Sequence, residues 1–183
     1  MNIYIHVEIS TRELDSKLLL ATLAAGKGHE VIISSSVEII SALSKKILKP
    51  GLFHTKSLTP SKTKITRHQK IIENKSVVSS IDEEGAINDY GYEQFAKDRY
   101  SEVSISQSAV VLGWGDEDTE TLKKRYNKYS GKIHKTGSPR IDLWRPFFSS
   151  YWTTPKEIPN KPFLLISSNL FSTSYKPFFE SIK

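Results

Sequence analysis

The sequence predicts an α/β fold in which helices cover both faces of a largely parallel β-sheet. From residue 3 to residue 136, short β-branched segments alternate with longer segments of helical periodicity. This alternation is typical of consecutive βαβ units, which lay their strands parallel in one sheet. The chain has 183 residues, of which 38% are hydrophobic and 25% charged, a composition that suits one globular domain with part of a second.

The first βαβ unit shows the pattern most clearly. Residues 3–7 alternate in side-chain character and include β-branched and aromatic types, which predicts a strand. Ser10 stands three residues before Glu13, the spacing of a capping box, so we expect a helix to begin at Ser10. Apolar residues at helical spacing continue to Gly26, and residues 31–33 form the second strand.

Four more strands follow, each separated from the last by a helical segment. The strands are predicted at residues 52–54, 77–81, 110–112 and 133–136. The helices are predicted at residues 37–48, 60–74, 92–100 with an extension over 103–108, and 116–129. Pro60 suits the first turn of its helix, because a backbone nitrogen needs no acceptor there. Together the six strands predict a Rossmann-like sheet.

The character of the sequence changes after Gly137. Prolines and aromatic residues become frequent, which is typical of a connection between domains. Residues 163–168 then have the apolar pattern of a buried strand, and no second sheet could form before Lys183. We expect a Rossmann-like N-terminal domain, a linker and the start of an incomplete second domain, at residues 1–145, 146–162 and 163–183.

Composition excludes several classes of protein. The chain has no cysteine, which excludes disulfides and thiolate zinc sites, and its five histidines lack the spacing of metal ligands. We therefore expect no metal and no cofactor. The N-terminus lacks the features of a signal peptide, and no apolar run is long enough to span a bilayer. These observations predict a cytoplasmic protein.

Charge is distributed unevenly along the chain. Residues 45–75 contain nine Lys and Arg against one Glu, a net charge of +8, whereas residues 82–102 contain seven acids against two bases, a net charge of −5. A basic stretch followed by an acidic one can orient a protein towards an anionic membrane, so we expect one positive face and peripheral contact with the inner membrane. Two solvated helix faces are an equally good interpretation.

An acidic segment, Asp82-Glu83-Glu84-Gly85, follows the predicted strand 77–81. Residues after a parallel strand lie at the edge where open α/β sheets bind ligands. Carboxylates there could deprotonate a hydroxyl or act as nucleophiles, and the glycine could let the backbone turn beside a substrate. We predict catalytic roles for the three carboxylates, with Asp82 favoured, and substrate binding at Gly85. The alternative is a polar turn.

Glu8 ends the first predicted strand and is expected at the same edge as Asp82. Two neighbouring carboxylates would raise the pKa of one of them, which would suit a catalytic acid or base. The alternative is an ion pair between Glu8 and Arg12. Arg12 could instead bind a substrate phosphate or carboxylate.

Two further groups are candidates for substrate binding. Lys56, Ser57 and Lys62 lie in a loop rich in amines and hydroxyls, which could hold an anionic acceptor or could simply be solvated. Arg140 follows the last predicted strand and could reach the cleft, although packing at a hinge is the stronger interpretation.

Several of these segments, taken in order, resemble the bacterial surface carbohydrate biosynthesis proteins, a GT-B-like family related to Kdo-type and polyglycerol-phosphate-type glycosyltransferases. The segments are Val7–Leu14, Gly28–Val31, Lys49–Gly51, Ser57–Lys62, Asp82–Gly85, Trp114-Gly115 and Thr136–Leu143. The resemblance implies transfer of a sugar from a nucleotide-activated donor, with CMP as one candidate nucleotide, to a glycan or lipid-linked acceptor. In this family a complete C-terminal domain binds the nucleotide sugar, so we expect a fragment without transferase activity.

Three other functions compete with this one. A nicotinamide or flavin enzyme is disfavoured because the turn after the first strand, residues 8–12, contains no glycine. A nucleic-acid-binding protein is disfavoured because Phe53 is the single aromatic residue within the basic stretch. A non-catalytic Rossmann-like binding domain, or a nucleotide-sugar epimerase of similar fold, remains an alternative.

Overall fold

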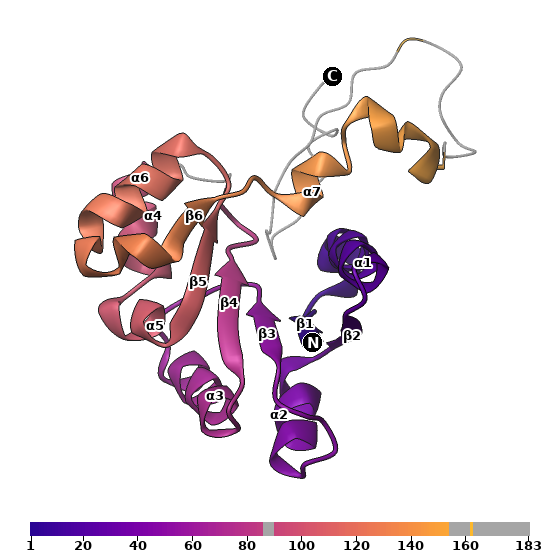
Figure 1. Cartoon of the computed structure of the whole chain (residues 1–183). Coiled ribbons are helices and arrows are strands. Elements are labelled where there is room, and N and C mark those ends of the chain that lie inside the picture. Colours follow the sequence, from indigo (N-terminus) through magenta and orange to yellow (C-terminus); the bar gives the residue numbers. More distant parts are fainter. Residues whose placement is uncertain (86–89, 154–161, 163–183) are drawn as a thin grey trace, which may run out of the picture. The chain divides into compact units, whose positions relative to one another are not determined.

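The computed structural model describes residues 1–85, 90–153 and 162 (Figure 1). Its centre is a six-stranded sheet with the order β2-β1-β3-β4-β5-β6, and every neighbouring pair of strands is parallel. The predicted α/β fold with a parallel sheet is therefore confirmed. The strands are β1 (Asn2–His6), β2 (Glu30–Ser34), β3 (Leu52–Thr55), β4 (Val77–Ile81), β5 (Ser108–Gly113) and β6 (Ile133–Lys135).

The helices alternate with these strands, as expected of βαβ units. They are α1 (Ser10–Gly26), α2 (Ser36–Ser44), α3 (Lys62–Glu73), α4 (Tyr92–Arg99), α5 (Glu102–Ser106), α6 (Asp116–Arg125) and α7 (Pro139–Asp142), with 3₁₀ helices η1 (Asn127–Lys132) and η2 (Pro146–Tyr151). None of the helices in the described part of the chain is long and apolar enough to cross a bilayer.

The predicted capping box of α1 is wrong. The N-cap is Ile9, and no side chain caps the helix there, because Ser10 already belongs to the first turn. The Glu13 carboxylate does turn back, but its Oε2 accepts a hydrogen bond from the backbone N–H of Glu8, at 2.9 Å. The Glu13 side chain therefore links the end of β1 to α1 and does not cap the helix.

Other helix ends also differ from prediction. Helix α3 starts after Pro60, because the hydroxyl of Ser61 caps it and accepts from the backbone N–H of Lys64. The segment expected as one helix from 92 to 108 is two helices, since Ser101 and Ser104 form a capping box that starts α5. Local hydroxyl caps thus set boundaries that apolar periodicity alone does not show.

The two faces of the sheet are covered differently. Helix α1 joins β1 to β2 in one direction along the sheet, and α3 joins β3 to β4 in the opposite direction. Because such crossovers are right-handed, the two helices lie on opposite faces, as Figure 1 shows. The chain therefore changes face between β1 and β3, at the topological switch point of the sheet.

The main hydrophobic core lies on the face covered by α2 to α6. Its fully buried members include Tyr4 and Phe53 of the sheet, Ile39 of α2, Ile71 of α3 and Leu122 of α6. On the other face, α1 and α7 leave part of the sheet uncovered. An apolar cavity of about 490 Å³ opens there over β1, β3, β4 and β5, and residues of both helices line it.

The chain divides into two compact units, Met1–Ser149 and Ser150–Lys183. The first contains the whole sheet. The strand predicted at residues 163–168, and with it the predicted start of a second domain, lies outside the described residues.

Candidate functional site

The predicted site residues lie at one edge of the sheet, where the parallel strands end. Glu8 follows β1, Lys56 and Ser57 follow β3, and the segment 82–85 follows β4. Arg12 lies in the first turn of α1, Lys62 is the first residue of α3, and Arg140 is in α7 after β6. Glu8 and Asp82 thus share the carboxyl edge of the sheet, as the parallel topology predicts.

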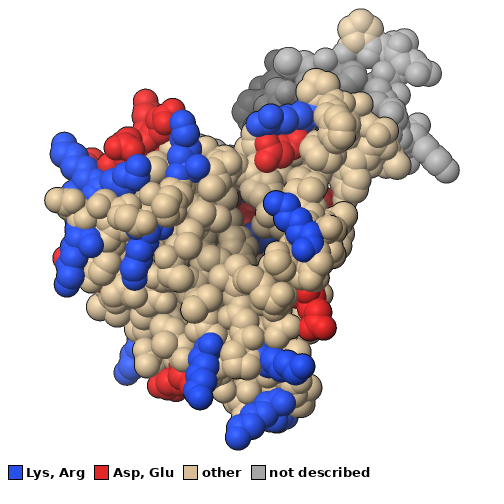
Figure 2. All heavy atoms as spheres, viewed as in Figure 1, with Lys and Arg blue, Asp and Glu red and all other residues tan. Residues whose placement is uncertain are grey.

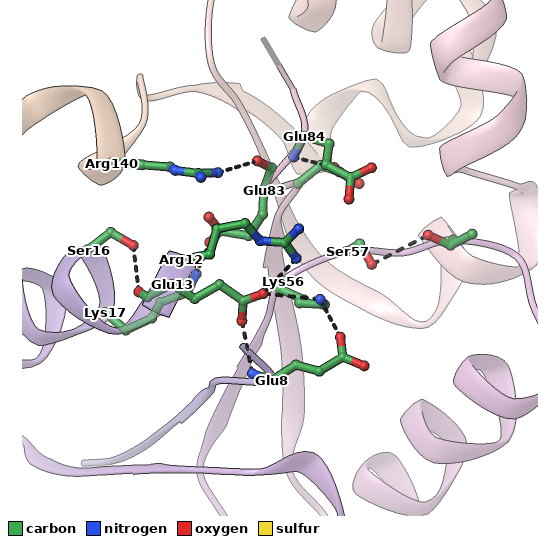
Figure 3. Close-up of polar contacts among 12 residues, drawn as sticks. Glu8, Arg12, Glu13, Ser16, Lys17, Lys56, Ser57, Glu83, Glu84 and Arg140 are labelled. Carbon is green, nitrogen blue, oxygen red and sulfur yellow. Dashed lines mark hydrogen bonds and ion pairs between the residues drawn. The ribbon is translucent and has the colours of Figure 1, made fainter. Parts of the chain in front are cut away.

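At the switch point, Lys56 joins two carboxylates. Its Nζ forms ion pairs with Oε2 of Glu8 and, at 3.1 Å, with Oε1 of Glu13 (Figure 3). Arg12 donates to the same Glu13 oxygen at 3.0 Å, so it pairs with its neighbour and not with Glu8. The Glu8 side chain is 55% exposed, whereas that of Glu13 is fully buried. Glu8 is therefore the carboxylate of this cluster that a substrate can reach.

The charges around Lys56 hold both carboxylates in their ionised form. The hydrogen bond from Lys56 lowers the pKa of Glu8, although burial opposes the shift. Burial acts to raise the pKa of Glu13, but the N–H of Glu8 and the side chains of Arg12 and Lys56 lower it to about 2. The expected rise in pKa from neighbouring carboxylates is therefore wrong for Glu8, because a lysine lies beside it.

Asp82 is almost fully buried and its carboxylate is fully engaged. Arg99 donates to both of its oxygens at 2.9 Å, and the backbone N–H of Glu84 donates to Oδ1 at 2.9 Å. Burial raises the pKa of Asp82, with Arg99 acting in the opposite direction. No contact joins Asp82 to Glu8 among the residues the structure describes. This geometry favours a role for Asp82 in holding the loop over a role as reacting group.

Gly85 lies directly against Trp114, after β5. A Cβ atom at Gly85 would come within 2.8 Å of the indole ring, and the indole N–H donates to the backbone carbonyl of Asp82 at 2.7 Å. The glycine is thus required by contact with Trp114. Its predicted substrate contact stays a prediction.

Glu83 points towards α1, where it forms a buried ion pair with Lys17. The two side chains are 7% and 1% exposed. The backbone of Glu83 is held as well, because its N–H donates to the carbonyl of Lys56 at 3.1 Å and its carbonyl accepts from Arg140 at 3.2 Å (Figure 3). Arg140 therefore reaches this edge and fastens the segment after β4. Glu84 is 45% exposed and pairs with Arg99.

Two important residues were missed from the sequence, Lys17 and Arg99. Both lie on helices, where a charged residue usually belongs to a solvated face. The spacing of Lys17 four residues after Glu13 was an available signal, because it places both side chains on one face of α1. Nothing near Arg99 in the sequence shows that its partner is Asp82.

Within the described residues, no three His, Asp or Glu side chains are grouped so that they could hold a metal ion. Comparisons of the chain with protein-family models, with curated proteins and with solved structures found no match. The carboxyl edge of the sheet is therefore the basis for assigning a function. Its distinguishing feature is an exposed carboxylate, Glu8, beside a cation, Lys56, at the topological switch point where α/β sheets bind ligands.

Proposed function

We propose that this chain is the acceptor-binding domain of a GT-B-type glycosyltransferase that builds bacterial surface carbohydrate. The observation that carries the proposal is the exposed Glu8 carboxylate at the switch point, held by Lys56. The ordered set of segments that resembles the surface carbohydrate biosynthesis proteins supports it. The donor is a nucleotide-activated sugar, which the resemblance assigns to a second domain, and the acceptor is a glycan or a lipid-linked glycan.

Glu8 is the general base in this proposal. Its carboxylate takes the proton of the acceptor hydroxyl while that oxygen attacks the anomeric carbon of the donor sugar. The bond from this carbon to the donor phosphate breaks, and its electrons leave with the nucleotide. The lowered pKa keeps Glu8 ionised at neutral pH, so it is ready to accept a proton. Arg12 and Lys56 lie beside it and can hold acidic groups of the acceptor.

Transfer and binding assays test this function. The chain, alone and joined to the donor-binding domain that the family implies, is incubated with acidic glycan acceptors and CMP-, UDP- or GDP-activated sugars, and products are detected by mass spectrometry. Glu8→Gln should lower transfer by roughly 10²-fold or more, as expected when a general base is lost, with folding unchanged. Glu73→Gln, an exposed change at the end of α3, serves as the matched control.

A non-catalytic binding domain is the second candidate. It is favoured by the internal pairing of Asp82 with Arg99 and of Glu83 with Lys17, which leaves few groups free for chemistry. The two candidates are distinguished by acceptor binding to the 183-residue chain, which is measured through amide chemical shifts around Glu8 and Lys56. Binding without transfer by the joined protein would support this second candidate, and the absence of both would contradict the proposed function.

A further inference from the structure

Lys64, which the sequence did not single out, contacts two hydroxyls at the carboxyl edge. It lies in the first turn of α3, and its Nζ donates to Oγ of Ser57 and, at 3.4 Å, to Oγ1 of Thr59. Ser57 is 1% exposed and Leu58 is fully buried, so the loop after β3 is anchored in the core. The amine and the hydroxyls are therefore held together on a fixed segment.

Among the described residues Lys64 has no carboxylate partner, in contrast to four other cations of this edge. Arg12, Lys17, Lys56 and Arg99 each form an ion pair with an Asp or Glu side chain. In the described part of the chain, no carboxylate lies within 4 Å of Lys64. This half-buried amine therefore forms no direct ion pair with a described carboxylate and contacts only hydroxyls.

The start of α3 adds positive charge to the same place. The N-terminus of a helix carries partial positive charge, and acidic side chains in the first turn normally balance it. Each of the other α-helices in the described residues has such an acid, but the first turn of α3 has none and contains Lys62 and Lys64. Burial lowers the pKa of Lys64, and nearby Arg99 and Lys56 lower it further, while Asp82 and Glu8 act in the opposite direction.

We propose that Lys64, Ser57 and Thr59, together with the start of α3, bind a phosphate group. An amine, two hydroxyls and a helix N-terminus supply donors from several directions, which suits the oxygens of a tetrahedral anion. The bound phosphate also supplies Lys64 with a negatively charged partner. That the group belongs to the glycosyl acceptor rests on the proposed function, whereas the anion site depends only on the contacts around Lys64.

Titration with inorganic phosphate tests the site. Calorimetry and thermal unfolding of the 183-residue chain are measured with phosphate or chloride at one ionic strength. Phosphate should bind and raise the melting temperature. Lys64→Met should weaken phosphate binding about tenfold or more, as expected for the loss of one charge-assisted hydrogen bond. Lys70→Met makes the same chemical change in the last turn of α3, where the side chain is exposed, and should bind as the wild type does.

Three results would overturn the proposal: no binding of phosphate by the wild type, equal binding by Lys64→Met, or an equal loss in Lys70→Met. Thr59→Val provides a second variant if Lys64→Met does not fold, and it should also weaken binding. Vesicles of phosphatidylcholine with and without phosphatidic acid distinguish a lipid phosphate from a soluble phosphate ester. Since none of these measurements involves sugar transfer, the site can hold while the proposed transferase activity fails.

Discussion

At the scale of single residues, Asp82 and Arg99 show how a charged group can serve structure inside a candidate site. Asp82 is nearly inaccessible, and its two oxygens receive three hydrogen bonds, two from Arg99 and one from the N–H of Glu84. A buried carboxylate without its cation costs far more than an exposed one. Arg99 therefore holds the segment after β4 by satisfying Asp82.

Replacing Arg99 tests this role. Arg99→Met leaves Asp82 buried without its cation, so the free energy of unfolding should fall by about 3 kcal/mol. Adding Asp82→Asn removes the uncompensated charge and should restore part of the loss. Urea unfolding of the two variants and the wild type at pH 7 measures both effects. Equal stability of Arg99→Met and wild type would show that the pair does not hold this segment.

At the scale of elements, the strands were predictable and the site was predictable in part. Strands such as Val77–Ile81 are short, largely buried runs that contain β-branched residues, and the sequence shows such runs directly. Parallel topology then places Glu8 and the segment 82–85 at one edge. The partners at that edge were not predictable, because Lys17 and Arg99 reach theirs only through packing of α1 and α4 against distant loops. Lys56 is the clearest case, since it was predicted to bind substrate and it pairs with Glu8 and Glu13.

Three histidines, one each in β1, β3 and α3, are buried. His6 of β1 stacks on Phe53 of β3 with ring centroids 6.0 Å apart, and the ring of His68 of α3 is tilted against Phe53 with centroids 6.5 Å apart. His54 of β3 contacts Oγ of Ser79 through Nδ1 at 3.0 Å. Burial lowers the pKa of His6 and His68 to about 4 and that of His54 to about 3.

These histidines predict loss of stability in mild acid. Below pH 6.5 these histidines take up protons in the unfolded chain but stay neutral in the folded chain. The free energy of unfolding therefore falls as the pH falls, until the pKa values of the folded state are reached. At pH 5 each histidine should cost about 2 kcal/mol, and the three together approach the stability of a typical domain. Urea unfolding at pH 7.5 and pH 5 measures the loss. His68→Leu should reduce the pH dependence, whereas His134→Gln, at an exposed position, should not; a stability independent of pH over this range would contradict the prediction.

At the scale of the molecule, the basic stretch does not form the single positive face expected from the sequence. Lys56 and Lys64 turn into the carboxyl edge, where they contact Glu8, Glu13 and the hydroxyls of the loop. The exposed lysines of the stretch lie mainly at the opposite, amino edge, where α2 and α3 end and β3 and β4 begin, and Figure 2 shows basic side chains at that end. They are Lys45, Lys46, Lys49, Lys70 and Lys75.

This distribution predicts weak binding to anionic vesicles through the amino edge, with the candidate site facing away from the lipid. Each lysine near an anionic surface contributes about 1 kcal/mol, and salt screens the attraction. Co-sedimentation with phosphatidylserine vesicles should therefore fall between low and high salt. Replacing Lys45, Lys49 and Lys70 by Glu should abolish it, whereas the same change at Lys62, Lys135 and Arg145, exposed residues at or beyond the carboxyl ends of β3 and β6, alters the net charge equally and should have a smaller effect. Equal binding to phosphatidylcholine, or equal loss in the two triple variants, would show that the amino edge is not a membrane-binding surface.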